Sequence, residues 1–339
     1  MDSEVTGPGA GRQYRTTDVA VSGGLLRVGI WEPAHPPTAT IVAVHGVTAS
    51  HLAWQWLVDA LPGVRVVAPD LRGRGRSAGI AGPAGLAAHA DDLAEVFSAL
   101  GLGPTLVVGH SMGAFVAVVF AHRHPDLTAG LVLLDGGLPL STPANLEAEE
   151  LIEAILGPTA ARLRMRFDGL DDYLAFWREH PAFGSVTDPR LRAYFAYDLV
   201  AADDLVSDGS SGAERPRRQR PATSYDVTTE DTVDLTVGSA LRDAWEALGD
   251  PSAHTPVDWV TVPLGLRAET PGLYSAGDAA RLASQYPAVA AARWEGLNHY
   301  TLVMSDGGAA RVAGVITQSL RGGGPSGATP ITGDRAVSG

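Results

Sequence analysis

A serine at the centre of a Gly-x-Ser-x-Gly pattern is the clearest candidate for chemistry in this chain. In residues 105–124, TLVVGHSMGAFVAVVFAHRH, a short apolar run predicts a buried strand before Ser111, and further apolar residues predict a helix after it. The serine would then occupy a sharp strand-to-helix turn, where side chains at Gly109 and Gly113 would collide with the neighbouring strand and helix. Such a turn holds the hydroxyl out of the sheet. It also places the amide of Met112 at a helix N-terminus, where developing negative charge is stabilised.

The pattern alone is weak evidence, because it arises by chance about 0.3 times in a chain this rich in glycine. Its context gives it weight, since four polar features directly follow predicted strands: His45-Gly46, Ser111, Asp135 and His299. Parallel strands end at one edge of a sheet, so these residues are expected to converge. A serine needs a base, and an imidazole acts near neutral pH when a carboxylate orients it. We therefore predict Ser111 as nucleophile and His299 as base.

Composition limits the partners. The 339 residues are 45% hydrophobic and carry a net charge of −13, which argues against nucleic acid or an anionic membrane as the main partner. The chain has no cysteine, which excludes disulfides, thiolate catalysis and cysteine-ligated metals. The histidines lack H-x-x-x-H and H-E-x-x-H spacing, so we predict no metal and no cofactor.

The sequence shows no secretion or membrane signal. Residues 1–15 contain no apolar core of a signal peptide, and no run approaches the roughly 18 apolar residues of a membrane span. We therefore expect a cytoplasmic protein. The oligomeric state does not follow from the sequence.

Strands and helices alternate along most of the chain, which predicts an α/β fold with a mostly parallel central sheet flanked by helices. Two strands are expected in 18–31, around Ser22-Gly23-Gly24, and the other strands at 40–44, 64–68, 106–108, 131–134, 259–267 and 289–294. Outside residues 139–225, helices are expected at 53–60, 87–100, 239–248, 277–286 and 312–320, besides the one that follows Ser111.

The alternation stops after the sixth strand, where a helical cap is expected. Residues 139–225 hold predicted helices at 144–155, 170–179 and 189–200, many aromatic residues, and a polar loop at 207–220. A cap over the strand ends would line a pocket as well as pack, so an apolar small molecule is the expected ligand. The residues chosen to line this pocket are His45, Gly46, Trp177, Phe183, Tyr194 and Tyr300.

The expected domain organisation follows from this interruption. Residues 14–138 and 226–320 form the two parts of one core on either side of the cap. Residues 1–13 and 321–339 are rich in small and polar residues, and both ends are expected to be disordered.

With these features in place, the chain resembles the α/β-hydrolase fold superfamily, in its lidded serine-hydrolase branch. The matching residues are His45-Gly46, the PDLRGRGRS segment at 69–77, the serine turn at 109–113, and Asn298-His299. The resemblance extends over about residues 17–320. It implies Ser111 as nucleophile, His299 as base, and the amides of Val47 and Met112 as the oxyanion hole. The Gly- and Arg-rich segment 69–77 lacks the P-loop pattern, so we interpret it as a turn ordered by Asp70.

The acid is where the sequence departs from the family. The family usually has an aspartate in the loop after the predicted strand 259–267, at a position that here holds Pro271. Asp135 ends the strand after the nucleophile helix, a position that some family members use. Glu269 lies two residues before the usual place and has a longer reach, whereas Asp278 is expected to lie in a helix. We favour Asp135 and keep Glu269 as the alternative.

The resulting functional prediction is a serine hydrolase acting on a carboxylic ester or lactone. Hydrolysis of a carbon–carbon bond, cofactor-free perhydrolysis and acyl transfer use the same triad and stay as alternatives. Related epoxide hydrolases and haloalkane dehalogenases have aspartate where Ser111 stands, which disfavours those reactions. Because a fold alone never proves activity, a non-catalytic ligand-binding protein is a further alternative.

Overall fold

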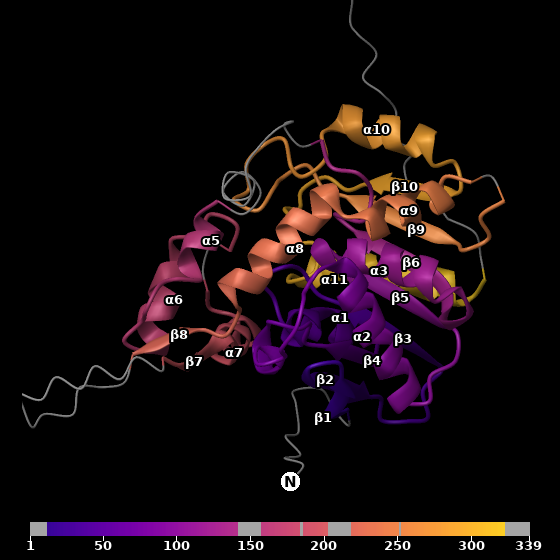
Figure 1. The fold of residues 1–339 in the computed structure, drawn as a ribbon. Coiled ribbons are helices and arrows are strands. Elements are labelled where there is room, and N and C mark those ends of the chain that lie inside the picture. Colours follow the sequence, from indigo (N-terminus) through magenta and orange to yellow (C-terminus); the bar gives the residue numbers. More distant parts are fainter. Residues whose placement is uncertain (1–11, 142–156, 184–185, 203–217, 251, 323–339) are drawn as a thin grey trace, which may run out of the picture.

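The computed structural model describes residues 12–141, 157–183, 186–202, 218–250 and 252–322. At its centre lies an eight-stranded sheet with the order β1-β2-β4-β3-β5-β6-β9-β10 (Figure 1). β2 is antiparallel to both of its neighbours, and all pairs from β4 to β10 are parallel. The strands are β1 (Gln13–Val21), β2 (Gly24–Glu32), β3 (Ala39–Val44), β4 (Val64–Pro69), β5 (Thr105–His110), β6 (Thr128–Leu134), β9 (Val257–Thr261) and β10 (Val289–Arg293). The predicted, mostly parallel α/β sheet is confirmed.

Helices cover both faces of this sheet. One face packs against α2 (Leu86–Ala99), α3 (Met112–Arg123), α9 (Ser239–Leu248) and α10 (Ala276–Gln285), and the other against α1 (Gln55–Ala60) and α11 (Asp306–Leu320). Short 3-10 turns, η1 (His51–Trp54), η2 (Gly75–Ser77) and η3 (Pro125–Leu127), join several of these elements.

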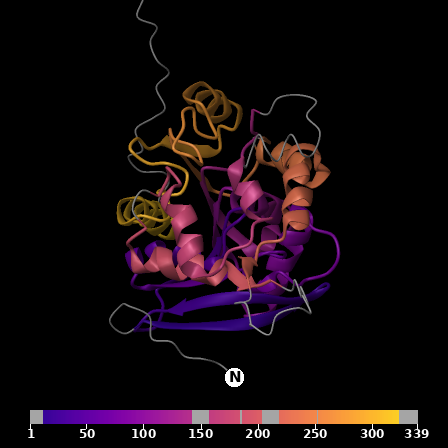
Figure 2. The same ribbon diagram turned by 90° about the vertical axis from the view of Figure 1, so that its left-hand side faces the viewer.

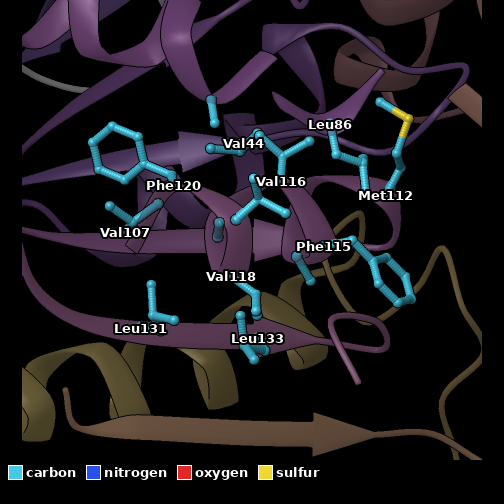
Figure 3. Packing of buried hydrophobic residues seen from close by; sticks show 14 of the residues in the cluster. Val44, Leu86, Val107, Met112, Phe115, Val116, Val118, Phe120, Leu131 and Leu133 are labelled. Carbon is cyan, nitrogen blue, oxygen red and sulfur yellow. The ribbon is translucent and has the colours of Figure 1, made fainter. Parts of the chain in front are cut away.

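Helix α3, which follows the serine, is buried along most of its length. Its Val116, Val118 and Phe120 pack near Val107 of β5 and Leu131 of β6 (Figure 3). Successive residues of β5 enter opposite clusters, Val107 with α3 and Val108 with α1 and α11. A strand that is buried on both faces has a continuous run of apolar residues, which explains why β5 could be predicted directly from the sequence.

Between β6 and β9 the chain leaves the sheet and forms a group of helices at one side (Figures 1 and 2). Its elements are α5 (Pro158–Arg162), α6 (Leu170–Arg178), α7 (Pro189–Asp198), β7 (Leu199–Ala201) and β8 (Gln219–Pro221), followed by α8 (Tyr225–Val237). The helices predicted at 170–179 and 189–200 are confirmed within two residues at each end. The predicted helix at 144–155 lies outside the described residues.

The sequence placed several boundaries wrongly. Residues 219 and 220 were expected in a loop, but they belong to β8, which pairs with β7 in an antiparallel ladder. The strand predicted at 259–267 ends at Thr261, beyond which only Leu264 makes an isolated bridge, to Asn298. Helix α11 begins at Asp306, six residues before the predicted start, because Ser305 caps it by accepting a bond from the Gly308 amide at 3.1 Å. Gln13, expected in a disordered end, begins β1.

No helix in the described ranges is both long enough and apolar enough to cross a membrane.

Candidate active site

Ser111 occupies a strained turn between β5 and α3. Its backbone has φ 54° and ψ −125°, a conformation that costs a residue with a side chain about 1–3 kcal/mol. The two glycines of the motif make the turn possible. A Cβ on Gly113 would overlap the carbonyl oxygen of Val44 in β3, and one on Gly109 would overlap the backbone at the start of α3. The predicted reason for both glycines is confirmed.

The ends of β3 and β6 both lie against the serine. The Ser111 amide donates to the carbonyl of Leu134 at the end of β6, at 2.9 Å. Gly46, just after β3, lies so close that a Cβ there would be 3.1 Å from the Ser111 Cβ and 3.5 Å from its Oγ. The hydroxyl therefore lies beside Gly46, at the carboxyl edge of the parallel strands.

His299 forms a short hydrogen bond with Asp135. Nδ1 of His299 lies 2.7 Å from Oδ2 of Asp135, and both side chains are almost completely buried. A carboxylate accepts, so Nδ1 carries the hydrogen, and the neutral ring then has its lone pair on Nε2. The Val262 amide lies 3.4 Å from the other carboxylate oxygen, Oδ1. Asp135 also has a positive φ of 45°, directly after β6.

The loop that carries His299 is fixed on two sides. The His299 amide donates to the carbonyl of Leu264 at 3.0 Å. The side-chain oxygen of Asn298 accepts from the amides of Tyr300 and Thr301, and its Nδ2 donates to the carbonyl of Ala182 at 3.0 Å. Asn298 thus closes the turn around the histidine and ties it to the helical insertion.

His110 joins the serine turn to the histidine loop. Its Nε2 donates to the carbonyl of His299 at 2.9 Å, and the two imidazole rings lie 4.6 Å apart. Burial, together with the nearby His299, lowers the pKa of His110 well below its usual range, so the ring is neutral. Because His110 directly precedes Ser111, this bond places the serine and His299 on the same side of the molecule.

The two other candidate acids lie elsewhere. Glu269 is exposed and accepts a bond from the amide of Arg267 at 2.6 Å, within its own loop. Asp278 lies in the first turn of α10, as predicted, where it interacts with Ser275 and Ser141. Of the three carboxylates weighed from the sequence, Asp135 is the one bonded to the imidazole.

Both residues expected to supply oxyanion amides touch one buried arginine. Arg74 donates from Nε to the carbonyl of Val47 at 2.8 Å, and its Nη2 lies 3.8 Å from Sδ of Met112. Met112 is the first residue of α3, so its amide has no acceptor within the helix. Arg74 therefore braces the residues on both sides of the serine hydroxyl.

Arg74 is in turn held by Asp231 of α8, with which it forms an ion pair in which both side chains are fully buried. Asp231 also accepts from His89 at 3.0 Å and from the Gly85 amide at 2.7 Å. Although burial raises the pKa of Asp231, the charges of Arg74 and His89 lower it below the usual range. Sequence reasoning missed this network, because Arg74 lies in the segment interpreted only as a turn.

The ion pair predicts a large effect on stability. Replacing Arg74 with methionine leaves Asp231 buried without its main partner, and we expect the free energy of unfolding to fall by about 3 kcal/mol or more. Urea denaturation followed by circular dichroism measures it. The matched control is Arg192→Met, which removes an exposed arginine paired with exposed Asp171 and should cost less than about 1 kcal/mol. Equal losses in the two variants would contradict a structural role for the buried pair.

Several of the residues expected to line the pocket are aromatic residues that contact one another near His299. Phe183 lies against Tyr300 with ring centroids 4.7 Å apart, Tyr300 contacts His299 at 5.6 Å, and Trp177 lies 5.3 Å from Phe183. Trp177 and Tyr194 are themselves almost fully buried.

His45 differs from its expected role as a pocket residue. Its ring is fully buried and bonded to the Leu71 amide at 3.0 Å and the Gly46 carbonyl at 2.8 Å, and burial lowers its pKa to about 4. It supports the loops rather than facing a ligand.

Across the described ranges, no group of three or more His, Asp or Glu side chains is placed to hold a metal ion.

Comparison with known proteins supports the same fold. A family model described as the alpha/beta hydrolase fold matches residues 39–184. The chain is 38% identical over 131 residues to lipase LipV of Mycobacterium tuberculosis, a match that covers 39% of this chain and 48% of that protein. It is 30% identical over 172 residues to a Bacillus subtilis protein named provisionally as a 2-succinyl-6-hydroxy-2,4-cyclohexadiene-1-carboxylate synthase, covering 50% of this chain and 61% of that protein. The chain thus spans about half the length of these curated relatives.

A solved structure extends the likeness to the whole fold. The crystal structure of E-2-(acetamidomethylene)succinate hydrolase superposes with a TM-score of 0.67 at 19% identity, covering 91% of this chain and 99% of that one. The sequence matches, the mainly parallel eight-stranded sheet and the serine turn between β5 and α3 lead to one conclusion. The described part of the chain has the α/β-hydrolase fold.

Proposed function

We propose that this protein is a serine hydrolase that cleaves a carboxylic ester or lactone of an apolar small molecule through an acyl-enzyme on Ser111. The observation that carries the proposal is the 2.7 Å bond between Nδ1 of His299 and Asp135, at the sheet edge where Ser111 occupies its strained turn. This bond leaves Nε2 of the imidazole with the lone pair that a general base requires.

The proposed reaction begins when Oγ of Ser111 attacks the carbonyl carbon and its proton passes to Nε2 of His299. The carbonyl oxygen becomes an oxyanion, which accepts bonds from the amides of Val47 and Met112. The tetrahedral intermediate collapses as His299 protonates the leaving alkoxide, and an alcohol departs. Water then attacks the acyl-enzyme with His299 again taking a proton, and collapse releases the carboxylic acid and restores the serine. Asp135 keeps the tautomer and stabilises the imidazolium.

The aromatic residues beside His299 support an apolar substrate. The ring of Tyr300 meets the imidazole edge-on, and Phe183 lies against Tyr300. The bond from Asn298 to Ala182 attaches the helical insertion to this loop. The relative named as a lipase favours an ester as the scissile group.

Covalent labelling tests the proposal. The intact protein should react with a fluorophosphonate, which forms a stable phosphonyl ester with an activated serine. Tryptic digestion and mass spectrometry should place the adduct on Ser111, and prior heat denaturation of the protein should prevent it. An adduct on another serine, or no adduct on the folded protein, would refute the assignment.

A second candidate keeps the three residues and changes the bond. The likeness to the Bacillus protein named as a synthase favours a reaction other than ester hydrolysis, with the carbon–carbon chemistry predicted above as the leading form. Labelling of Ser111 combined with no turnover of p-nitrophenyl esters of two to eight carbons would favour this candidate.

A further inference from the structure

A cavity of about 350 Å³ opens where α8 begins, and the residues of the proposed active site do not line it. Polar and charged residues from two segments surround it. The segment after α5 provides Arg164 and Arg166, and the segment joining β8 to α8 provides Arg220, Thr223, Ser224 and Tyr225. In Figure 1 these segments meet beside the lower end of α8.

The cavity is strongly basic in a chain of net charge −13, since three of these six residues are arginines. Cζ of Arg164 lies 3.7 Å from the ring centroid of Tyr225, a cation–π contact that fixes the guanidinium beside this ring. Nη1 of Arg220 donates to the carbonyl of Pro221 at 3.1 Å, and Nη1 of Arg166 donates to the carbonyl of Met165 at 3.2 Å. A guanidinium has five N–H donors in a planar fork, and the bond from Arg220 to the Pro221 carbonyl uses one of them.

The N-terminus of α8 adds a further positive field at the same place. Ser224 caps this thirteen-residue helix by accepting a bond from the Val227 amide at 3.3 Å. The first turn of a helix carries partial positive charge and attracts anions. The one acidic residue of this turn, Asp226, is exposed.

Thr223 gives an independent sign that the cavity binds a polar ligand. It lines the cavity and is 2% exposed, and its Oγ1 has no hydrogen-bond partner in the described part of the chain. Leaving a buried hydroxyl without a partner costs about 1–3 kcal/mol, and an oxygen bound in the cavity would accept its hydrogen.

We propose that this cavity binds a phosphate group, either as inorganic phosphate or as a phosphate monoester. A tetrahedral oxyanion presents several acceptor oxygens, which suits arginines on two segments, a hydroxyl and a helix N-terminus that surround one hollow. The anion would also link the segment after α5 to the start of α8. This site does not depend on the proposed hydrolase activity.

Isothermal titration of the full chain with inorganic phosphate tests the site, at about 150 mM sodium chloride so that diffuse surface attraction is screened. We expect saturable binding at one site per chain. Arg164→Ala and Arg220→Ala should each weaken binding about tenfold or more, because each loses a charge-assisted bond. Thr223→Val, which keeps the shape and removes the hydroxyl, should weaken it about fivefold.

Arg218→Ala is the matched control, since Arg218 is exposed, pairs with Asp168 and lies two residues from Arg220 outside the cavity lining. It should leave the Kd within about twofold of the parent. Far-UV circular dichroism checks that every variant is folded. Absence of saturable phosphate binding, or an equal loss in Arg218→Ala, would overturn the proposal.

Repeating the titration with butyl phosphate identifies the form of the ligand. Binding at least about tenfold tighter than that of inorganic phosphate would show that the site takes an esterified phosphate. Equal or weaker binding would show that it takes the free ion. If the wild-type protein bound neither butyl phosphate nor inorganic phosphate, both versions of the proposal would be contradicted.

Discussion

Replacing Ser111 with alanine is expected to lower kcat/KM for p-nitrophenyl butyrate by roughly 10⁵- to 10⁶-fold. The substitution removes the oxygen that forms the acyl-enzyme, and no neighbouring group at the turn offers another nucleophile of the same geometry. What remains is the modest rate contributed by binding and oxyanion stabilisation. Initial rates at substrate concentrations well below KM give this ratio directly.

Ser50→Ala is the matched control for this experiment. Ser50 is also a buried serine in the loop after β3, and its Oγ has no hydrogen-bond partner in the part of the chain that the structure describes. It does not cap η1 with its side chain, so its removal should change kcat/KM by less than about twofold. If the Ser111→Ala variant kept more than about a hundredth of the parental kcat/KM, the acyl-enzyme route would be ruled out.

The serine turn could be predicted because its causes are local. A buried β5, the two glycines and the apolar start of α3 all lie within one short segment, and the steric need for Gly109 and Gly113 follows from the turn itself. The convergence of Asp135 with His299 followed from topology alone, since parallel strands end on one edge of a sheet.

The elements that sequence reasoning missed depend on distant contacts. Helix α8, YDVTTEDTVDLTV, is rich in β-branched Thr and Val, which have low helix propensity, and its apolar residues lack a clear helical period. It is held by its carboxylates instead. Asp231 binds Arg74, and Asp234 accepts from the Leu86 amide at 2.7 Å. A sequence pattern contains no sign of such pairings between segments about 150 residues apart.

The choice of acid also required the structure. Asp135 and Glu269 both follow predicted strands, and β6 and β9 are neighbours in the sheet, so either loop could have approached the imidazole. The early end of β9 at Thr261 decides the geometry. The chain then turns back on itself, and the Gly265 amide donates to the Glu269 carbonyl at 2.9 Å, so Glu269 stays in that loop.

The same geometry makes Asp135→Asn the second large prediction, with an expected fall in kcat of roughly 10³- to 10⁴-fold. The asparagine has nearly the same shape, but its amide can donate a hydrogen to Nδ1 of His299. That bond favours the tautomer with the hydrogen on Nε2, which then faces the serine as a donor and cannot accept its proton. Steady-state kinetics with p-nitrophenyl butyrate measure the loss.

Glu269→Gln is the matched control, because it makes the same chemical change in the rival carboxylate. Glu269 is exposed and bonded within its own loop, so kcat should stay within about twofold of the parent. Fluorophosphonate labelling together with circular dichroism distinguishes loss of the general base from loss of folding. Asp135→Asn should react with the probe far more slowly while it keeps the parental circular dichroism spectrum. A large loss in Glu269→Gln with full activity in Asp135→Asn would transfer the role to Glu269. It would also require a rearrangement of the 265–269 loop that brings that carboxylate to Nδ1 of His299 in place of Asp135.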